Sequence, residues 1–340
     1  MAEQKKMQDP YATERAHLQA VHPMLRYDGE ETVPAWQERA RGVLGELLGF
    51  SAMRRVTEEA FTIDYDREQE GHREIRFSLQ TEEGYAVPAV LCIPKDIPLP
   101  VPVCLCLQGH STGMHISLGR PKWPGDEKTI ANGDWDFARR ILAEGVAALC
   151  VEQRCMGECG SKADGYPDCQ NTAMTALLTG RTLLGERVWD IMRVVDHLYR
   201  FPELDTERVW CMGNSGGGTA TLYAAAMDPR LTAAMPSCAV CDFAASIGAM
   251  YHCACNYVPR IANYFDMGDI AALIAPRPLV VVCGVQDSIF PLPGVKHAVA
   301  VAQDVYRAAG AQDRLRLVQG EGGHRFYAKA AWNTFNALVR

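Results

Sequence analysis

The pattern of apolar positions changes along the chain. An amphipathic helix is predicted over residues 35–50, because apolar residues recur there at three- and four-residue spacing before Gly49. Short alternating segments at 61–63, 75–77 and 86–91 then predict antiparallel strands. We expect residues 1–55 to form a peripheral N-terminal helical extension and residues 56–340 to form the main domain.

Beyond residue 100, short apolar runs alternate with helical patterns. The apolar runs cover 101–107, 145–151, 209–212, 231–235, 279–283 and 315–318. The clearest helical patterns cover 182–200, 219–227, 298–309 and 328–339. Runs that are apolar on both faces, each followed by a helix, are typical of a parallel sheet covered on both sides. We therefore predict an α/β fold with antiparallel leading strands and a mostly parallel central sheet.

Two connections are long for a compact domain, at 116–136 and 242–269. We interpret the second as a lid-like insertion. Its aromatic residues and those of the first connection could line a pocket for an acyl group or a sugar, or could cover the sheet edge. These aromatic residues are Trp123, Trp135, Tyr251, Tyr257, Tyr264 and Phe265.

Composition and charge exclude several classes of protein. The 340 residues are 48% hydrophobic and 22% charged, which is an ordinary globular mixture. A net charge of −7 without a Lys/Arg cluster argues against a nucleic-acid binder. The polar first eleven residues resemble no secretory signal, and no apolar run approaches the roughly 18–20 residues of a membrane span. We expect a soluble, cytoplasmic protein and leave a homo-oligomer open.

The cysteines do not suggest a disulfide framework. Their number, 13, is odd, and several lie in apolar runs, such as Cys104, Cys106 and Cys283, where a free thiol acts as a small apolar side chain. The spacing of Cys238 and Cys241, followed by Cys253 and Cys255, allows a redox or metal site as the alternative, and we expect packing or lid structure instead.

The strongest chemical signal is Gly213-Asn214-Ser215-Gly216-Gly217, between a predicted strand and a predicted helix. This G-x-S-x-G context is typical of a serine nucleophile on a sharp turn, with glycines two residues on either side to avoid collisions. The helix N-terminus also offers N–H groups to developing negative charge. A structural Gly-rich turn is the alternative; a phosphate loop is disfavoured because G-x-x-x-x-G-K-[ST] is absent.

A serine nucleophile needs a base and an acid, which follow it along the chain in folds of this type. Among the histidines after Ser215, we predict His324 as the base, because it follows the last strand; His252 lies in the insertion and His297 on a helix. We predict Asp287 as the acid, since it follows strand 279–283. Asp242 is its main rival, and Asp266 and Asp269 are weaker ones.

The oxyanion requires two backbone donors. The amide of Gly216 is one, and the loop Gln108-Gly109-His110 after the run 101–107 supplies the other, which we predict to be the amide of His110.

The order of these motifs, together with Gln153-Arg154-Cys155-Met156-Gly157-Glu158, resembles the α/β-hydrolase superfamily over roughly residues 60–340. More narrowly, it resembles the dienelactone-hydrolase-like and acetyl xylan esterase-like bacterial branch. Relatives carry Asp-x-Arg-Gly-x-Gly where this chain has Cys155 in place of a glycine, and dienelactone hydrolases use cysteine where this chain has Ser215. The resemblance implies no cofactor.

These observations predict a serine hydrolase acting on a small-molecule ester, such as a small acyl ester or an acetylated carbohydrate, with no metal. An amidase or peptidase with the same triad is one alternative. A non-catalytic binding protein on a hydrolase fold is the other.

Overall fold

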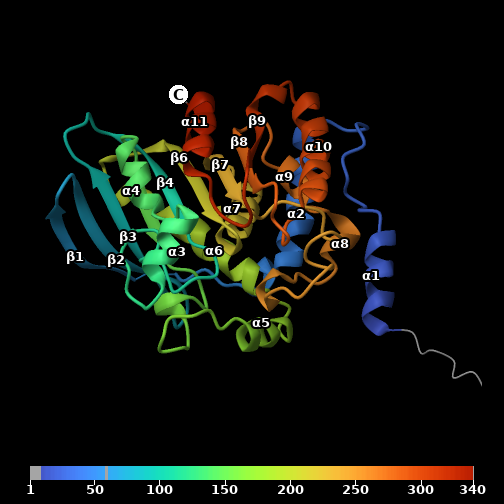
Figure 1. The fold of residues 1–340 in the computed structure, drawn as a ribbon, viewed down its shortest axis with the longest axis horizontal. Coiled ribbons are helices and arrows are strands. Elements are labelled where there is room, and N and C mark those ends of the chain that lie inside the picture. The colour runs from blue at the N-terminus through green and yellow to red at the C-terminus, as the bar shows by residue number, and fades with distance from the viewer. Residues whose placement is uncertain (1–8, 58–59, 340) are drawn as a thin grey trace, which may run out of the picture.

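The computed structural model describes residues 9–57 and 60–339, so most of the polar segment Met1–Tyr11 lies outside the described residues. Figure 1 shows a central sheet with helices around it. The strands are β1 (Phe61–Gln69), β2 (His72–Glu82), β3 (Tyr85–Pro94), β4 (Val101–Leu107), β5 (Ala147–Val151), β6 (Leu204–Asn214), β7 (Leu231–Ser237), β8 (Leu279–Gly284) and β9 (Leu315–Gly320). The helices are α1 (Pro10–Ala20), α2 (Val33–Leu48), α3 (Asp126–Gly133), α4 (Phe137–Ala143), α5 (Gln170–Leu177), α6 (Leu183–Asp196), α7 (Gly216–Met227), α8 (Ile261–Tyr264), α9 (Met267–Ala272), α10 (Leu292–Ala308) and α11 (Ala328–Val339).

The strands form one sheet in the order β1-β2-β3-β5-β4-β6-β7-β8-β9. The neighbours from β1 to β5 pair antiparallel, and those from β5 to β9 pair parallel. The predicted α/β fold, with antiparallel strands leading into a parallel sheet, is confirmed. Because parallel strands end at the same edge, the loops after β4, β6, β8 and β9 open on one side of the molecule.

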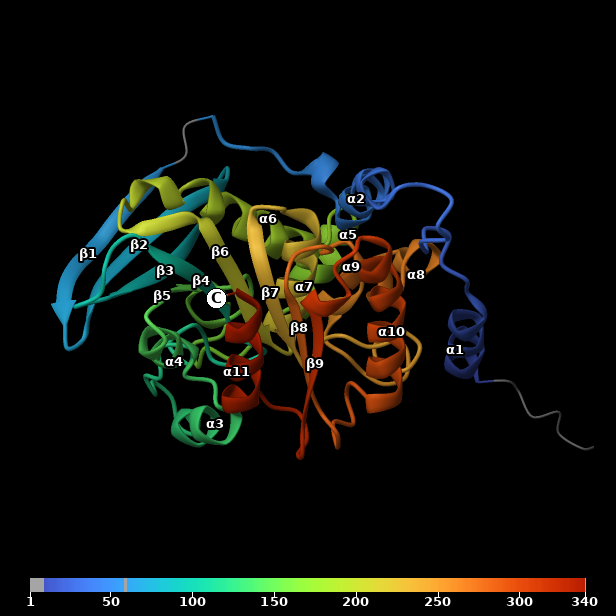
Figure 2. The ribbon, with the colours of Figure 1, turned by 90° about the horizontal axis from the view of Figure 1, so that it is seen from above.

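Helices cover both faces of the parallel part (Figure 2), and the two faces have separate apolar cores. The alternating side chains of β4 explain why there are two cores. Val103, Leu105 and Leu107 belong to the larger core beneath α2, α6, α7 and α10, whereas Cys104 and Cys106 belong to the smaller core beneath α4 and α11. A strand buried on both faces needs apolar residues at every position, which explains the continuous apolar run. The expectation that these cysteines are buried free thiols is confirmed.

The amino-terminal helices differ from expectation in one respect. Helix α2 begins after Thr32, whose hydroxyl accepts a hydrogen bond from the Ala35 amide, and ends at Gly49 in the left-handed region (φ 88°). However, Trp36 and Leu48 are buried in the larger core, so α2 is an integral part of the helical layer and not peripheral.

The two long connections are partly helical. The connection 116–136 contains α3, and the segment 242–269 contains α8 and the start of α9. Among the described residues, the helices are either too short or too polar to cross a membrane.

Candidate active site

Ser215 lies on the sharp turn between β6 and α7. Its backbone has φ 56° and ψ −123°, a combination that costs a non-glycine residue about 1–3 kcal/mol. The Ser215 amide donates a hydrogen bond of 2.8 Å to the carbonyl of Ser237, which anchors the turn to the end of β7. The strained turn therefore stands at the edge of the sheet where the strand-end loops meet.

The glycines around Ser215 are required by close backbone approach. A Cβ on Gly217 would lie 2.0 Å from the Leu107 carbonyl oxygen, and one on Gly213 would lie 2.5 Å from the Gly217 backbone. A Cβ on Gly216 would lie 2.8 Å from the ring of His110. Since real Cβ atoms do not approach backbone so closely, α7 can begin beside β4 only with glycine at positions 213 and 217, whereas a Cβ at position 216 would meet a side chain.

The buried Asp287 pairs with the half-buried His324. Asp287 Oδ2 lies 2.8 Å from His324 Nδ1, and its other oxygen accepts hydrogen bonds from the amides of Ile289 (2.8 Å) and Phe290 (3.2 Å). Burial would raise the pKa of Asp287, but the hydrogen bond with His324 and these two amides lower it overall. The Phe290 ring stacks on the imidazole, with centroids 5.9 Å apart. The carboxylate thus stays ionised and holds the ring by Nδ1.

Ser215 and His324 line the same cavity, which has a volume of about 350 Å³. Among the described residues, no hydrogen bond joins the Ser215 hydroxyl to His324; such contacts often form only when substrate is bound. Residues that no sequence motif indicates also line this cavity. They are Thr219, Met250, Asn256, Ile289 and Phe290. No local motif marks them, because three separate segments contribute them.

The rival acids have other partners. Asp242 pairs with His297 at 2.8 Å, on the outer part of α10. Asp266 accepts hydrogen bonds from the amides of Phe243 and Met267 and so caps α9, and Asp269 pairs with Arg26. Of the four candidate acids, the structure brings only Asp287 to His324.

His110 follows β4, and its ring lies against Gly216. Among the described residues, neither the amide of His110 nor that of Gly216 donates a hydrogen bond to protein, which leaves both free for a ligand in the cavity that these residues line. The ring Nε2 of His110 points elsewhere, toward the Sγ of Cys255 at 3.1 Å.

The aromatic residues of the insertion divide into three environments. Tyr251 lines the cavity and is 91% exposed, and Trp135 lines it from the other long connection. Tyr257 donates its hydroxyl hydrogen bond to the Ile247 carbonyl and lines a different cavity, next to α1. Phe265 is fully buried in the larger core. Of the two alternatives that the sequence left open, pocket lining therefore does not apply to Tyr257 and Phe265 at the cavity of Ser215.

The cysteine pair Cys238 and Cys241 lies apart from the pair Cys253 and Cys255. Cys238 lies beside Asp287 and His324, and burial raises its pKa to about 12. Cys241 packs near the Pro291 carbonyl, and its pKa is likewise raised to about 12 by burial. Neither joins Cys253 and Cys255 in a common group of ligands among the described residues. Their spacing in the sequence therefore marks no shared site.

Cys155 stands in the loop where the sequence departs from the family motif. It has φ 67°, in the left-handed region where relatives carry glycine. The loop keeps the conformation that favours glycine, although this chain has a cysteine there.

Comparisons with known proteins agree with the fold. The Bacillus subtilis (strain 168) protein named "Putative hydrolase YtaP" is 27% identical over 292 residues, which are 84% of this chain and 92% of that protein. The structure of a "putative acetyl xylan esterase" from Bacteroides fragilis has a TM-score of 0.78 at 17% identity, covering 100% of this chain and 92% of the other. A glucuronoyl esterase from Solibacter usitatus has a TM-score of 0.67 at 18% identity, covering 93% and 96%.

These structural likenesses show the α/β-hydrolase fold, and they confirm the predicted resemblance to the acetyl xylan esterase-like branch at the level of fold. The family model described as "Abhydrolase family" matches residues 6–316, which is most of the chain. This chain therefore belongs to the Abhydrolase family.

Proposed function

We propose that this protein is a serine hydrolase of carboxylic esters. The observation that carries the proposal is the position of Ser215, strained on its turn, in one cavity with a histidine that a buried carboxylate holds by Nδ1. Relatives in structure that are named as esterases agree with this chemistry.

In the proposed mechanism, Ser215 Oγ attacks the acyl carbonyl carbon while His324 Nε2 takes the hydroxyl proton. Asp287 keeps the proton of Nδ1 in place and stabilises the imidazolium that forms. The amides of His110 and Gly216, with the N-terminus of α7, stabilise the oxyanion. His324 then gives its proton to the departing alkoxide. In the second half, water attacks the carbonyl carbon of the acyl-enzyme while His324 takes a proton from it. His324 returns this proton to Ser215 Oγ as the carboxylic acid leaves.

We propose a small, neutral acyl group, with an acetylated carbohydrate as one candidate substrate. The side chains that line the cavity are mostly apolar or neutral, with Trp135, Met250, Tyr251 and Phe290 among them, and within the described part of the chain no lysine or arginine lines it. An anionic acyl group would thus meet no counter-charge there. The aromatic walls could pack on an acyl chain or stack on a sugar ring.

We also propose that the insertion 242–269 sets specificity. It contributes Met250, Tyr251, His252, Cys253 and Asn256 to the cavity that Ser215 and His324 also line. Its residues touch the space a substrate would occupy without forming the Asp287–His324 pair.

The test is labelling by a fluorophosphonate probe and hydrolysis of p-nitrophenyl esters of increasing acyl length. Ser215→Ala is expected to lose labelling and about 10⁶ in kcat, because the three residues act as a unit. The exposed-serine variant Ser51→Ala is the matched control and should keep both. Activity of Ser215→Ala within tenfold of wild type would remove the assignment. Faster cleavage of p-nitroacetanilide than of p-nitrophenyl acetate would favour the amidase alternative, and an unlabelled wild type would favour a binding protein.

A further inference from the structure

Four potential metal ligands converge behind the His110 loop. They are His110 after β4, Cys169 at the start of α5, and Cys253 and Cys255 in the insertion. Their ligand atoms all lie within 4.8 Å of one another. His110 Nε2 is 3.1 Å from Cys255 Sγ, which is 3.4 Å from Cys253 Sγ. Three segments that are distant in the sequence therefore meet at one point.

The distances fit a tetrahedral ion. Zn–S bonds of about 2.3 Å and Zn–N bonds of about 2.0–2.1 Å place the ligand atoms of a tetrahedral site about 3.5–3.8 Å apart. The separations here, from 3.1 Å to at most 4.8 Å, bracket these values. The side chains can thus reach an ion at their centre by shifts of less than an ångström.

The chemistry of the ligands selects the metal. Three thiolates and one imidazole are soft and borderline ligands, which suit zinc and disfavour calcium, magnesium and manganese. The Cys₃His set is a known structural type of zinc site. Because four protein ligands complete the tetrahedron, no position remains for a water or a substrate.

The surroundings supply a compensating charge. Zinc with three thiolates carries one negative charge. Arg187 in α6, only 2% exposed, donates hydrogen bonds to the Arg154 carbonyl oxygen (2.7 Å) and to Cys169 Sγ (3.3 Å). A buried guanidinium next to a thiolate is stabilised by that negative charge, and the site in turn by the cation.

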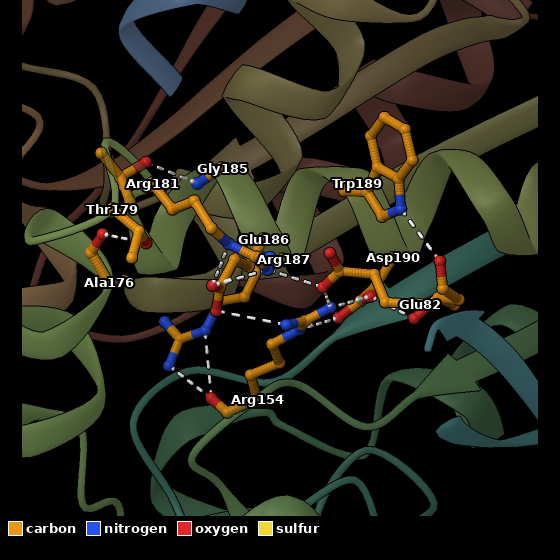
Figure 3. A network of polar contacts seen from close by, with 12 residues as sticks. Glu82, Arg154, Ala176, Thr179, Arg181, Gly185, Glu186, Arg187, Trp189 and Asp190 are labelled. Carbon is orange, nitrogen blue, oxygen red and sulfur yellow. Dashed lines mark hydrogen bonds and ion pairs between the residues drawn. The ribbon is translucent and has the colours of Figure 1, made fainter. Parts of the chain in front are cut away.

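The neighbouring Arg154 does not compete for this role. Figure 3 shows Arg154 amid carboxylates, and its guanidinium bonds to Asp190 at 2.7 Å and to Glu82 at 2.7 Å. Its positive charge is already balanced there, whereas the guanidinium of Arg187 contacts the cysteine cluster.

From this geometry we infer that His110, Cys169, Cys253 and Cys255 bind one structural zinc ion, which fastens the insertion and the segment before α5 to the His110 loop. On binding, the ion replaces the protons of those thiols that are protonated, and these protons leave to solvent. The sequence-based expectation of no metal is replaced by this proposal. Two of its ligands, Cys253 and Cys255, had been considered only with Cys238 and Cys241.

Under the proposed function, on which this step rests, His110 would carry an oxyanion donor on its backbone and a zinc ligand on its side chain. Removing the ion would then free the loop that positions the amide, so kcat for a minimal ester should fall while the fold persists.

The main test measures metal and not activity. The full chain is purified after tag removal, reconstituted with zinc under reducing conditions, and freed of loosely bound ions before elemental analysis. We expect about one zinc per chain in the wild type and at least a tenfold loss in Cys169→Ala and Cys255→Ala. The matched control is Cys159→Ala. Cys159 is a half-buried cysteine of the segment between β5 and α5, which also carries Cys169, but it lies outside the cluster. This variant should keep its zinc.

Two further measurements keep the test decisive. Cobalt(II) bound to the wild type should give the intense visible bands of a tetrahedral thiolate site, even where a cysteine variant fails to fold. Ser215→Ala should bind zinc as the wild type does, so a failure of the proposed esterase function is distinguishable from a failure of this site. The inference is overturned if reconstituted wild type holds less than a tenth of an equivalent, if both cysteine variants keep the metal, or if mass spectrometry shows a Cys253–Cys255 disulfide in the reduced preparation.

Discussion

The pairs Asp287–His324 and Asp242–His297 have the same hydrogen-bond distance, and exchanging each acid for its amide tests which of the two serves the active site. Asp287 lies 2.8 Å from His324, and Asp242 lies 2.8 Å from His297. The side chain of Asp287 is fully buried and that of Asp242 is 21% exposed. We expect Asp287→Asn to abolish most turnover and Asp242→Asn to leave it nearly intact.

The geometry around Asp287 determines how much kcat the Asp287→Asn variant should lose. One carboxylate oxygen accepts the amides of Ile289 and Phe290, so the asparagine oxygen keeps that place and its NH₂ group faces His324 Nδ1. Nδ1 must then accept, which moves the ring proton to Nε2, where it blocks removal of the serine proton. The cost is about 10⁴ in kcat, or roughly 5.4 kcal/mol at 1.36 kcal/mol per tenfold. Asp242 and His297 form an exposed pair that stabilises by about 0–1 kcal/mol.

The assay is steady-state hydrolysis of p-nitrophenyl acetate near neutral pH, with thermal unfolding of each variant to show that it is folded. Asp242→Asn should keep kcat within about threefold of wild type, since its partner lies outside the cavity. The reasoning fails if folded Asp287→Asn keeps kcat within tenfold, or if Asp242→Asn loses the larger share.

Other predictions follow from burial and backbone approach. Tyr251→Ala should change KM and the ranking among esters but not the rate on the smallest ester, and an unchanged ranking would contradict the proposed role of the insertion in specificity. Phe265→Ala should instead lower the free energy of unfolding by about 3–5 kcal/mol, as measured in denaturant, because its ring is fully buried. Gly217→Ala should cost about 3 kcal/mol or more, since its Cβ would lie 2.0 Å from a carbonyl oxygen, whereas Gly42→Ala, with open space around it, should not destabilise. The depressed pKa of Asp287 means that its stabilising contribution is present above its unfolded pKa of about 3.9 and is lost as pH falls through the lower folded value. The difference in unfolding free energy between wild type and Asp287→Asn should therefore shrink in acid, and a constant difference would contradict this.

Much of the fold could be predicted because its signals are local. The run 101–107 coincides with β4, and the pattern 328–339 coincides with α11. Two helix boundaries shifted. Helix α10 begins at Leu292, before the predicted start at 298, with a proline in its first turn. Helix α6 ends at Asp196, before the predicted end at 200, because a separate 3-10 turn forms at Leu198–Arg200. Glycine capping explains the accurate end of α2 at Gly49.

The sequence by itself determined the turn that carries Ser215, because a strained strand-to-helix turn needs glycines at fixed offsets along the chain. It also determined which strand ends carry Asp287 and His324, since parallel strands deliver their loops to one edge. Only the tertiary structure decided between Asp287 and Asp242, because both follow strands and the choice depends on which histidine each one meets. It alone brought His110 to Cys255, 145 positions away in the chain, because no spacing rule connects side chains whose meeting depends on how three loops pack.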